Sequence, residues 1–557
     1  MQFFNGCDWP NSIGWTGATI QTHLASALIT MTTSSDYGIQ HNNLASVDEQ
    51  ARNTETVIQS YFGQIANYFF NQRAQGFTTQ AYDDMGWLAL GWLEAIKFVN
   101  IHNSRHYSGN VSNNTPDNVY SGMQFVPAFA HRARLFADLI NDGYDAPQWR
   151  NLCGGGIIWN AAMLPYKNSV TNQLYIAMNV GMYLYSPGDT DPSPLYQLAS
   201  SNQCTDRTVS YNPPVPGTLN QQSPPLPPTP PQDPRYLTRA VEAFNWISSV
   251  GLQNDRGLFT DGFHISDWDD ATRSSRHNTC DERNDMLYTY NQGVILSGVR
   301  GLWEATGNTT YLNFGYNLIG AVINATGYNH PNPDANMGLG RGGIMEEFCD
   351  ADGSCSQDAQ SFKGLFFHHL NEFCSPLPLN PRVPDKTFYA SDEQAQIHEA
   401  MCMGYLDWLS ANAAAAYATA NTSGDFGGWW GQPAGGANPV GGNTNDPPNS
   451  CVDYRNNRDA LLTGGFMRSS SSSLSHSVSN HTTQPQPLLP RLLGMKKVNP
   501  SAFNFAAQSP QKPNEKDVYA ADVNDRGRGR TVETQAGALA LFNALFSIGS
   551  GHIVEGR

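Results

Sequence analysis

Two adjacent carboxylates, Asp83 and Asp84, begin a strongly apolar segment of the sequence. The residues from Met85 to Leu93 carry no charge and are mostly apolar. A helix that is apolar all round is normally buried, so both carboxylates are expected at the edge of a core. Capping explains one of them, because an Asp at a helix start accepts backbone N–H bonds. The second needs another role, and paired carboxylates are the usual machinery of glycosidic bond cleavage.

Adjacent helical positions suit acid/base chemistry at a single centre. Consecutive residues diverge by about 100° around a helix axis, so two neighbouring side chains can flank a bound atom. Retaining glycosidases need carboxyl groups roughly 5 to 5.5 Å apart, and neighbouring positions can satisfy that spacing. One carboxylate then stays ionised as the nucleophile, while the other, with a pKa raised by the nearby charge, protonates the leaving oxygen.

Helices are predicted to position this pair, because helical periodicity dominates the sequence. Apolar residues recur at three- and four-residue steps over residues 20–31, 57–72, 83–99, 126–141, 174–185, 236–250, 290–306, 311–326, 360–371, 392–420 and 532–546. Strand-like alternation is scarce by comparison. The pattern favours an all-α architecture.

Three segments are predicted to be surface insertions in a single domain that spans residues 1–557. Residues 211–234 are rich in Pro, residues 426–450 in Gly, Asn and Pro, and residues 469–490 are a serine run followed by polar residues. None can bury enough apolar surface to offset its ordering entropy. Helical patterns lie on both sides of each segment, so the core is expected to continue past them.

The overall composition excludes some partners and favours others. Charged residues make up 14% of the chain, aromatic residues 11%, and the formal net charge is −16. Scattered basic residues offer no stripe for a phosphate backbone, so no nucleic-acid partner is expected. No stretch reaches the ~18 to 20 apolar residues of a membrane-spanning helix. Few charged and many aromatic side chains suit a surface that stacks on sugars. The chain is expected to be a monomer.

Cysteines and glycosylation triplets favour a secreted or cell-wall protein. The nine cysteines form no C-x-x-C pair, which favours disulfides plus an odd thiol. Six triplets could accept N-linked glycans, at Asn110, Asn113, Asn308, Asn324, Asn421 and Asn480. The N-terminus lacks the basic start and apolar core of a signal peptide, so that segment is expected to be absent from this chain.

No metal or cofactor is expected from the remaining patterns. Asp350, Asp352 and Gly353 resemble part of a calcium loop but lack the closing Glu, so a disulfide between Cys349 and Cys355 is favoured. The G-x-G-x-x-G pattern at 338–343 follows Asn and Pro instead of a strand, which argues against dinucleotide binding.

Several separated motifs resemble glycoside hydrolase family 76, the endo-α-1,6-mannanases and their fungal cell-wall relatives. They occur in the family's order, at residues 82–87, 92–95, 153–160, 166–172, 261–262, 289–293, 355–364 and 533–536. The resemblance spans about residues 15 to 547 without the three insertions. It implies an (α/α)6 toroid with a groove that binds α-1,6-mannan or another mannose-containing oligosaccharide. Carried over, Asp83 is the nucleophile and Asp84 the acid/base.

Other motif residues are candidates for substrate binding. Three aromatic side chains could form sugar platforms or belong to the core, namely Trp87, Trp159 and Tyr290. Three amides could bond hydroxyl groups or brace the backbone, namely Asn160, Asn291 and Gln292.

Two further motif residues carry a charge. The family match favours Asp261 as a ligand of a sugar hydroxyl, although Asp before Gly is also common in ordinary turns. Lys363 is as well suited to a structural ion pair as to a contact with substrate.

Three functions remain open on the sequence alone. The first is an endo-acting α-1,6-mannanase that works through a glycosyl-enzyme intermediate. A transglycosylase of the cell wall shares that chemistry up to the intermediate and then uses a sugar hydroxyl in place of water. A non-catalytic glycan-binding or wall protein is the third, and retention of both carboxylates argues against it.

Overall fold

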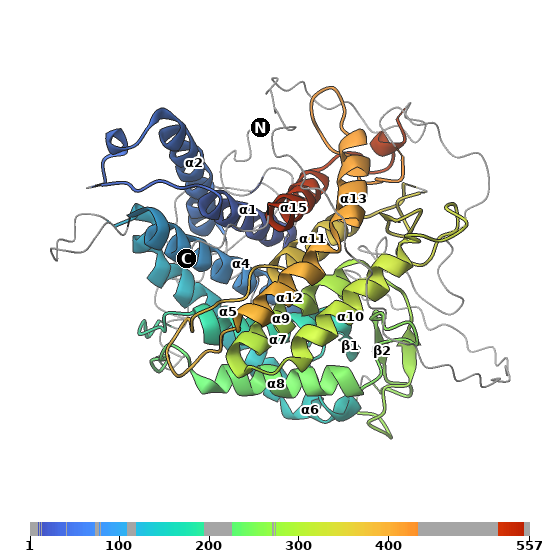
Figure 1. Cartoon of the computed structure of the whole chain (residues 1–557). Coiled ribbons are helices and arrows are strands. Elements are labelled where there is room, and N and C mark those ends of the chain that lie inside the picture. Colours follow the sequence, from blue (N-terminus) through green and yellow to red (C-terminus); the bar gives the residue numbers. More distant parts are fainter. Residues whose placement is uncertain are drawn as a thin grey trace, which may run out of the picture.

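The computed structural model is dominated by helices (Figure 1). The residues that it describes run from 9 to 550 and leave out 10–11, 13, 41, 73–76, 78–79, 108–118, 194–224, 270–271, 273, 352 and 433–521. Within them every strand has only two or three residues, which confirms the predicted all-α architecture. None of the described helices is both long enough and apolar enough to cross a membrane.

Six of the described helices form a closed inner ring. Each packs against the next and the last packs against the first, in the order α1 (Thr16–Thr33), α4 (Tyr82–His102), α7 (Ser169–Tyr185), α9 (Tyr290–Thr306), α11 (Phe362–Phe373) and α15 (Val532–Gly549). Nearly every residue of α7 and α11 is buried, as expected for helices covered on all sides. Thr16 donates to Glu533 at 2.7 Å, which joins α1 to α15 across 517 positions.

An outer layer of helices covers this ring. The pairs are α2 (Glu49–Asn71) on α1, α5 (Val126–Asp145) on α4, α8 (Pro234–Ser249) on α7, α10 (Thr310–Ala325) on α9, and both α12 (Asp392–Met403) and α13 (Leu406–Ala418) on α15. The outer helices are amphipathic: α8 buries Tyr236, Ala240, Ala243 and Ile247 on one side. Six inner helices with an outer layer make an (α/α)6 barrel, as the family resemblance implied.

The helices predicted from periodicity are present, and one prediction is wrong in detail. Most boundaries differ by a few residues, although α2 begins earlier, at Glu49. Residues 392–420 form two helices instead of one, because α12 ends at Met403. Gly404 is a poor helix former, and the Cys374–Cys402 disulfide fixes the end of α12 to the end of α11.

Short strands next to the ring helices were not predicted. An antiparallel sheet has the order β1 (Tyr166–Asn168), β2 (Gly262–His264) and β3 (Glu282–Asn284). A second pair joins β4 (Gly340–Arg341) to β5 (Ile344–Met345). Three residues are too few to show an alternating pattern in the sequence. Because β1 runs directly into α7, this sheet lies at the N-terminal end of a ring helix.

Single-turn helices complete the described elements. They are α6 (Pro147–Arg150), η1 (Leu44–Ser46), η2 (Asn103–Tyr107), η3 (Ser121–Phe125), η4 (Leu152–Gly154), η5 (Ala359–Ser361) and η8 (Val523–Asp525).

The two longest gaps in the description each begin and end at neighbouring points of the fold. Leu226 donates its backbone N–H to the Pro192 carbonyl at 2.9 Å. The Asn524 amide donates to the Gln432 carbonyl at 3.0 Å. The predicted insertions 211–234 and 426–450 lie partly in these gaps, and 469–490 lies outside the described residues. The three insertions and the single-domain division stay predictions.

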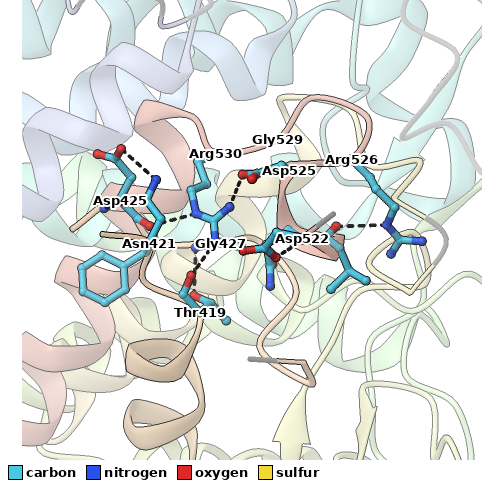
Figure 2. A network of polar contacts seen from close by, with 12 residues as sticks. Thr419, Asn421, Asp425, Gly427, Asp522, Asp525, Arg526, Gly529 and Arg530 are labelled. Atoms are coloured by element: carbon cyan, nitrogen blue, oxygen red, sulfur yellow. Dashed lines mark hydrogen bonds and ion pairs between the residues drawn. The ribbon is translucent and has the colours of Figure 1, made fainter. Parts of the chain in front are cut away.

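Arg530 fastens the chain beyond the second gap to the end of α13 (Figure 2). Its guanidinium donates to the carbonyls of Thr419 at 2.7 Å and Asp425 at 2.9 Å. It also pairs with Asp522 at 2.9 Å and with Asp525. Since Arg530 lies shortly before α15 begins, this network helps to place the last helix of the ring.

Three disulfides lie within the described residues. They are Cys153–Cys280, Cys349–Cys355 and Cys374–Cys402. The second confirms the predicted closure of the loop at 349–355. The other three cysteines lie outside the described residues, namely Cys7, Cys204 and Cys451.

The glycosylation triplets remain predictions. Asn308 and Asn324 are exposed, and Asn421 is partly exposed with its amide donating to Asp425 at 3.2 Å. The other three acceptors lie outside the described part of the chain, namely Asn110, Asn113 and Asn480.

The Cys153–Cys280 disulfide is expected to contribute most to stability among these three. It closes a sequence separation of 127 residues, against 6 for Cys349–Cys355, and a longer loop loses more unfolded-state entropy. Replacing both Cys153 and Cys280 by Ser should lower the free energy of unfolding by about 2–5 kcal/mol. Equilibrium unfolding in urea measures this, with the Cys349→Ser Cys355→Ser pair as the matched control. A larger loss in the control would contradict the expectation.

Candidate active site

The N-terminal ends of five of the six ring helices meet at a cavity of about 160 Å³. It is lined by Trp15, Asp83, Asp84, Trp87, Trp159, Tyr166, Asn168, Asp261, His264, Tyr288, Tyr290, Ser356, Asp358 and Phe362. Ring helices α4, α9 and α11 contribute residues of their first turns, and α1 and α7 contribute the residues just before them. Helix N-termini carry partial positive charge, so this end of the barrel favours carboxylates and developing negative charge.

Asp83 is held in the first turn of α4 by two donors. Its Oδ2 accepts from the Trp159 indole at 3.0 Å, and its Oδ1 accepts from the backbone N–H of Asp84 at 3.0 Å. Burial raises the pKa of Asp83 to about 7; these bonds oppose the rise, and the charge of Asp261 adds to it. Asp83 therefore sits where a carboxyl group changes its charge near neutral pH.

Asp84 is the next residue and also lines the cavity. Both side chains are partly exposed, whereas the residues from Met85 to Ala89 are buried. The helix start is anchored from outside, because the backbone N–H of Tyr82 donates to the carbonyl of Trp159 at 2.8 Å. The two carboxylates thus face one open space from a fixed helix end, as the sequence predicted for residues at the edge of a core.

Asp261 is a third carboxylate of the cavity and is fixed by three donors. The Tyr166 hydroxyl donates to Oδ2 at 2.5 Å, Asn284 donates to Oδ2 at 3.1 Å, and Asn291 donates to Oδ1 at 3.2 Å. Burial and the Asp261 charge raise the pKa of Tyr166 well above its usual value, so this hydroxyl stays protonated and donates. Because Asp261 directly precedes β2, the three-stranded sheet sets its position.

Aromatic rings form much of the cavity wall. Trp87 stacks on Trp15 with ring centroids 5.6 Å apart and planes 20° apart. Tyr290 contacts Phe362 at a centroid distance of 4.1 Å. Trp87, Trp159 and Tyr290 therefore line the cavity, where sequence analysis placed sugar platforms. Apolar ring faces beside carboxylates suit a ligand with both CH and hydroxyl surfaces.

The three predicted amides do not line the cavity. Asn160 accepts the backbone N–H of Ala162 at 2.9 Å within a turn. Asn291 is fully buried and reaches the cavity only through Asp261.

Gln292 is also fully buried, and both of its amide atoms bond the backbone of Phe259 at 2.8 Å. Lys363, the motif residue of undecided role, forms a buried ion pair with Asp350 at 2.6 Å. These residues therefore make structural contacts within the protein, which was the alternative to substrate binding for each.

Residues that were not chosen from the sequence complete the cavity. Several belong to the motifs already quoted, namely Tyr166, Asn168, Asp358 and Phe362. His264 lies opposite Tyr166 in the β1–β2 register, and burial lowers its pKa. No signal in the sequence pairs these two positions. The described residues that line the cavity include four carboxylates and neither Lys nor Arg.

This chain resembles known proteins in sequence and in fold. Residues 229–425 match the model of glycosyl hydrolase family 76. No curated protein matches the sequence. The matched segment includes Asp261 and Tyr290, whereas Asp83 and Asp84 precede it.

Solved structures with a related shape include three proteins. The α-1,6-mannanase GH76A of Salegentibacter sp. HEL1_6 is 16% identical, with 79% of this chain and 89% of that chain covered and a TM-score of 0.42. Dfg5 from Chaetomium thermophilum in complex with glucosamine is 15% identical, with coverages of 75% and 73% and a TM-score of 0.44. A family 76 mannosidase from Bacteroides thetaiotaomicron is 13% identical, with coverages of 76% and 86% and a TM-score of 0.39.

Proposed function

Because this chain belongs to glycoside hydrolase family 76 through its residues 229–425, we propose that it is a retaining glycoside hydrolase that cleaves α-1,6-mannosidic linkages. The observation that carries the proposal is the pair Asp83 and Asp84, which line one cavity with Asp261 and several aromatic rings. Carboxylates supply the acid, base and nucleophile of glycosidic cleavage, and aromatic faces bind sugar CH surfaces. Mannan is proposed from the family resemblance.

In the first step, Asp83 attacks the anomeric carbon while Asp84 donates its proton to the departing glycosidic oxygen. The bond from the anomeric carbon to that oxygen breaks, and an ester forms between the sugar and Asp83. In the second step, Asp84 removes a proton from water, whose oxygen attacks the anomeric carbon and releases Asp83. Two inversions leave the sugar with its original configuration.

The pKa of Asp83 bears on this assignment. Sequence reasoning gave the raised pKa to the acid/base residue, and the structure raises the pKa of Asp83, the proposed nucleophile. A nucleophile must be ionised, so the proposal requires pH values around or above 7 in the free enzyme.

The direct test is incubation with linear α-1,6-mannan, followed by chromatography of the oligosaccharides. Endo-acting hydrolysis should give a ladder of shorter fragments, and NMR of the first products should show the α-anomer. Longer products with an added acceptor oligosaccharide would identify a transglycosylase instead. Binding of mannooligosaccharides without any bond cleavage would leave the chain as a glycan-binding protein and refute the catalytic proposal.

Secretion is proposed alongside this activity. Disulfides persist in oxidising compartments, and the described residues hold three of them. A secreted enzyme can reach the mannan of a cell wall, because both lie outside the cell membrane.

A further inference from the structure

Asn168 lines the cavity with a polar side chain that the fold itself does not use. It is the residue before α7, the position at which Asn usually caps a helix by accepting a backbone N–H. Here the side chain makes no capping hydrogen bond. The residue is only 5% exposed, and its Oδ1 has no hydrogen-bond partner among the described residues.

A buried amide oxygen without a partner is costly, and native proteins rarely keep one without a reason. Asn168 gives up both the stabilisation of a cap and the pairing of its oxygen. The oxygen itself is covered, and a half-turn of the amide about the Cβ–Cγ bond would direct it to a ligand in the cavity. We propose that the Asn168 amide hydrogen-bonds a ring hydroxyl of the bound sugar and orients that sugar toward Asp83 and Asp84; this rests on the proposed function.

The backbone of Asn168 is fixed, so its side chain is held ready for a ligand. Its carbonyl accepts from the Asn172 amide at 2.8 Å. The backbone N–H of Ser169 donates to the Asp261 carbonyl at 2.7 Å. In the β1–β2 register Asn168 lies opposite Gly262, where an added Cβ would come within 2.8 Å of the Asn168 Cα. Glycine thus permits the close approach that brings Asp261 and Asn168 to one wall.

Asn172 provides the contrast within the same motif. Its Oδ1 accepts the Ile157 N–H at 2.8 Å, and its Nδ2 donates to the Ile157 carbonyl at 3.0 Å. It is fully buried, and the cavity-lining residues do not include it. Asn172 is therefore a structural amide, and Asn168, four residues earlier, is available to a ligand.

A neutral hydroxyl is the partner that an amide fits here. The amide can accept a hydrogen bond at oxygen and donate at nitrogen, and a sugar hydroxyl can do both as well. The cavity already contains four carboxylates. A neutral side chain can therefore recognise a hydroxyl without adding to the charge that controls proton transfer.

The experiment measures binding of α-1,6-mannotetraose by calorimetry in an Asp83→Asn Asp84→Asn background, which prevents cleavage. Asn168→Ser should weaken binding about tenfold or more through the lost hydrogen bond. Its melting temperature should stay equal or rise, because Ser is a good helix cap. Asn172→Ala is the matched control and should lower the melting temperature.

The outcomes separate this inference from the function on which it rests. If the background protein binds mannotetraose and Asn168→Ser binds it equally well, Asn168 is no ligand and the inference fails alone. If the background protein binds no mannooligosaccharide, the proposed function fails and the inference fails with it. A lower melting temperature in Asn168→Ser with unchanged affinity would assign a structural role instead.

Discussion

Asp83→Asn and Asp84→Asn should each lower kcat/KM on α-1,6-mannan by at least about a thousandfold, because each removes a group that bonds to the reacting atoms. Both carboxylates lie in the first turn of α4 and line the same cavity. Asparagine keeps the size of each side chain but can neither attack the anomeric carbon nor transfer a proton. Initial rates of reducing-end formation measure the loss.

An activated substrate separates the two roles. An aryl α-mannoside with a strongly acidic leaving group needs little protonation as it departs. Asp84→Asn should therefore regain much of its bond-cleavage rate on this substrate, visible as a burst of aryl alcohol. Asp83→Asn should remain inactive on it, because no nucleophile is left.

The matched control is Asp255→Asn, which removes an exposed carboxylate away from the cavity and should leave activity unchanged. Comparable activity in wild type and Asp83→Asn would refute the assignment of Asp83 as the nucleophile. A burst in Asp83→Asn with none in Asp84→Asn would reverse the two roles.

The pH profile should respond in opposite directions to two neighbours of Asp83. Burial and, to a lesser extent, the charge of Asp261 raise the pKa of Asp83 to about 7, and the Trp159 hydrogen bond opposes the rise. The nucleophile acts when ionised, so the acidic limb of kcat/KM should fall as the pH drops through this pKa. Asp261→Asn removes a negative charge and should move the acidic limb to lower pH. Trp159→Phe removes a donor and should move it to higher pH.

Activity at the plateau should fall as well in Asp261→Asn, by about ten- to a hundredfold, because the three donors around Asp261 lose a charged acceptor. Asn284→Asp adds a negative charge beside Asp261 and should move the acidic limb of kcat/KM to higher pH. This variant is the control for the direction of the shift. Measurement of kcat/KM from pH 4 to 9 gives all the limbs. An acidic limb at the same pH in wild type, Asp261→Asn and Trp159→Phe would show that Asp83 does not control the pH profile.

The helices of this barrel could be predicted because their apolar residues repeat with the helix period. Residues 290–306 were predicted and observed with the same boundaries. The sheet of β1, β2 and β3 could not, because three-residue strands leave no alternating pattern and the pairing of β1 with β2 joins positions about a hundred residues apart. The toroid was likewise expected only from the family resemblance, since periodicity shows that a helix is buried and not which helix covers it.

The candidate site was predictable where a motif begins a helix and less so inside one. Tyr290, Asn291 and Gln292 are consecutive, and no sequence pattern shows which of them faces the cavity. About 100° lies between successive side chains, so Tyr290 lines the cavity, Asn291 reaches Asp261, and Gln292 bonds the backbone of Phe259.

Asn168 could not be singled out as a cavity residue from the sequence, for a different reason. Sequence motifs include it, but a helix-preceding Asn looks like an ordinary cap. Only the coordinates show that its side chain leaves the helix N–H groups unbonded and lines the cavity.

The closing contact between α1 and α15 also has a consequence for how the protein is made. Thr16 bonds Glu533 across almost the whole chain, and the last helix lies between α1 and α11. During synthesis the first five ring helices emerge before α15, so the ring stays open between α11 and α1 until α15 has been made. Such long-range closure is slow compared with pairing of neighbouring helices. The ring is therefore complete only after α15 has packed between α11 and α1.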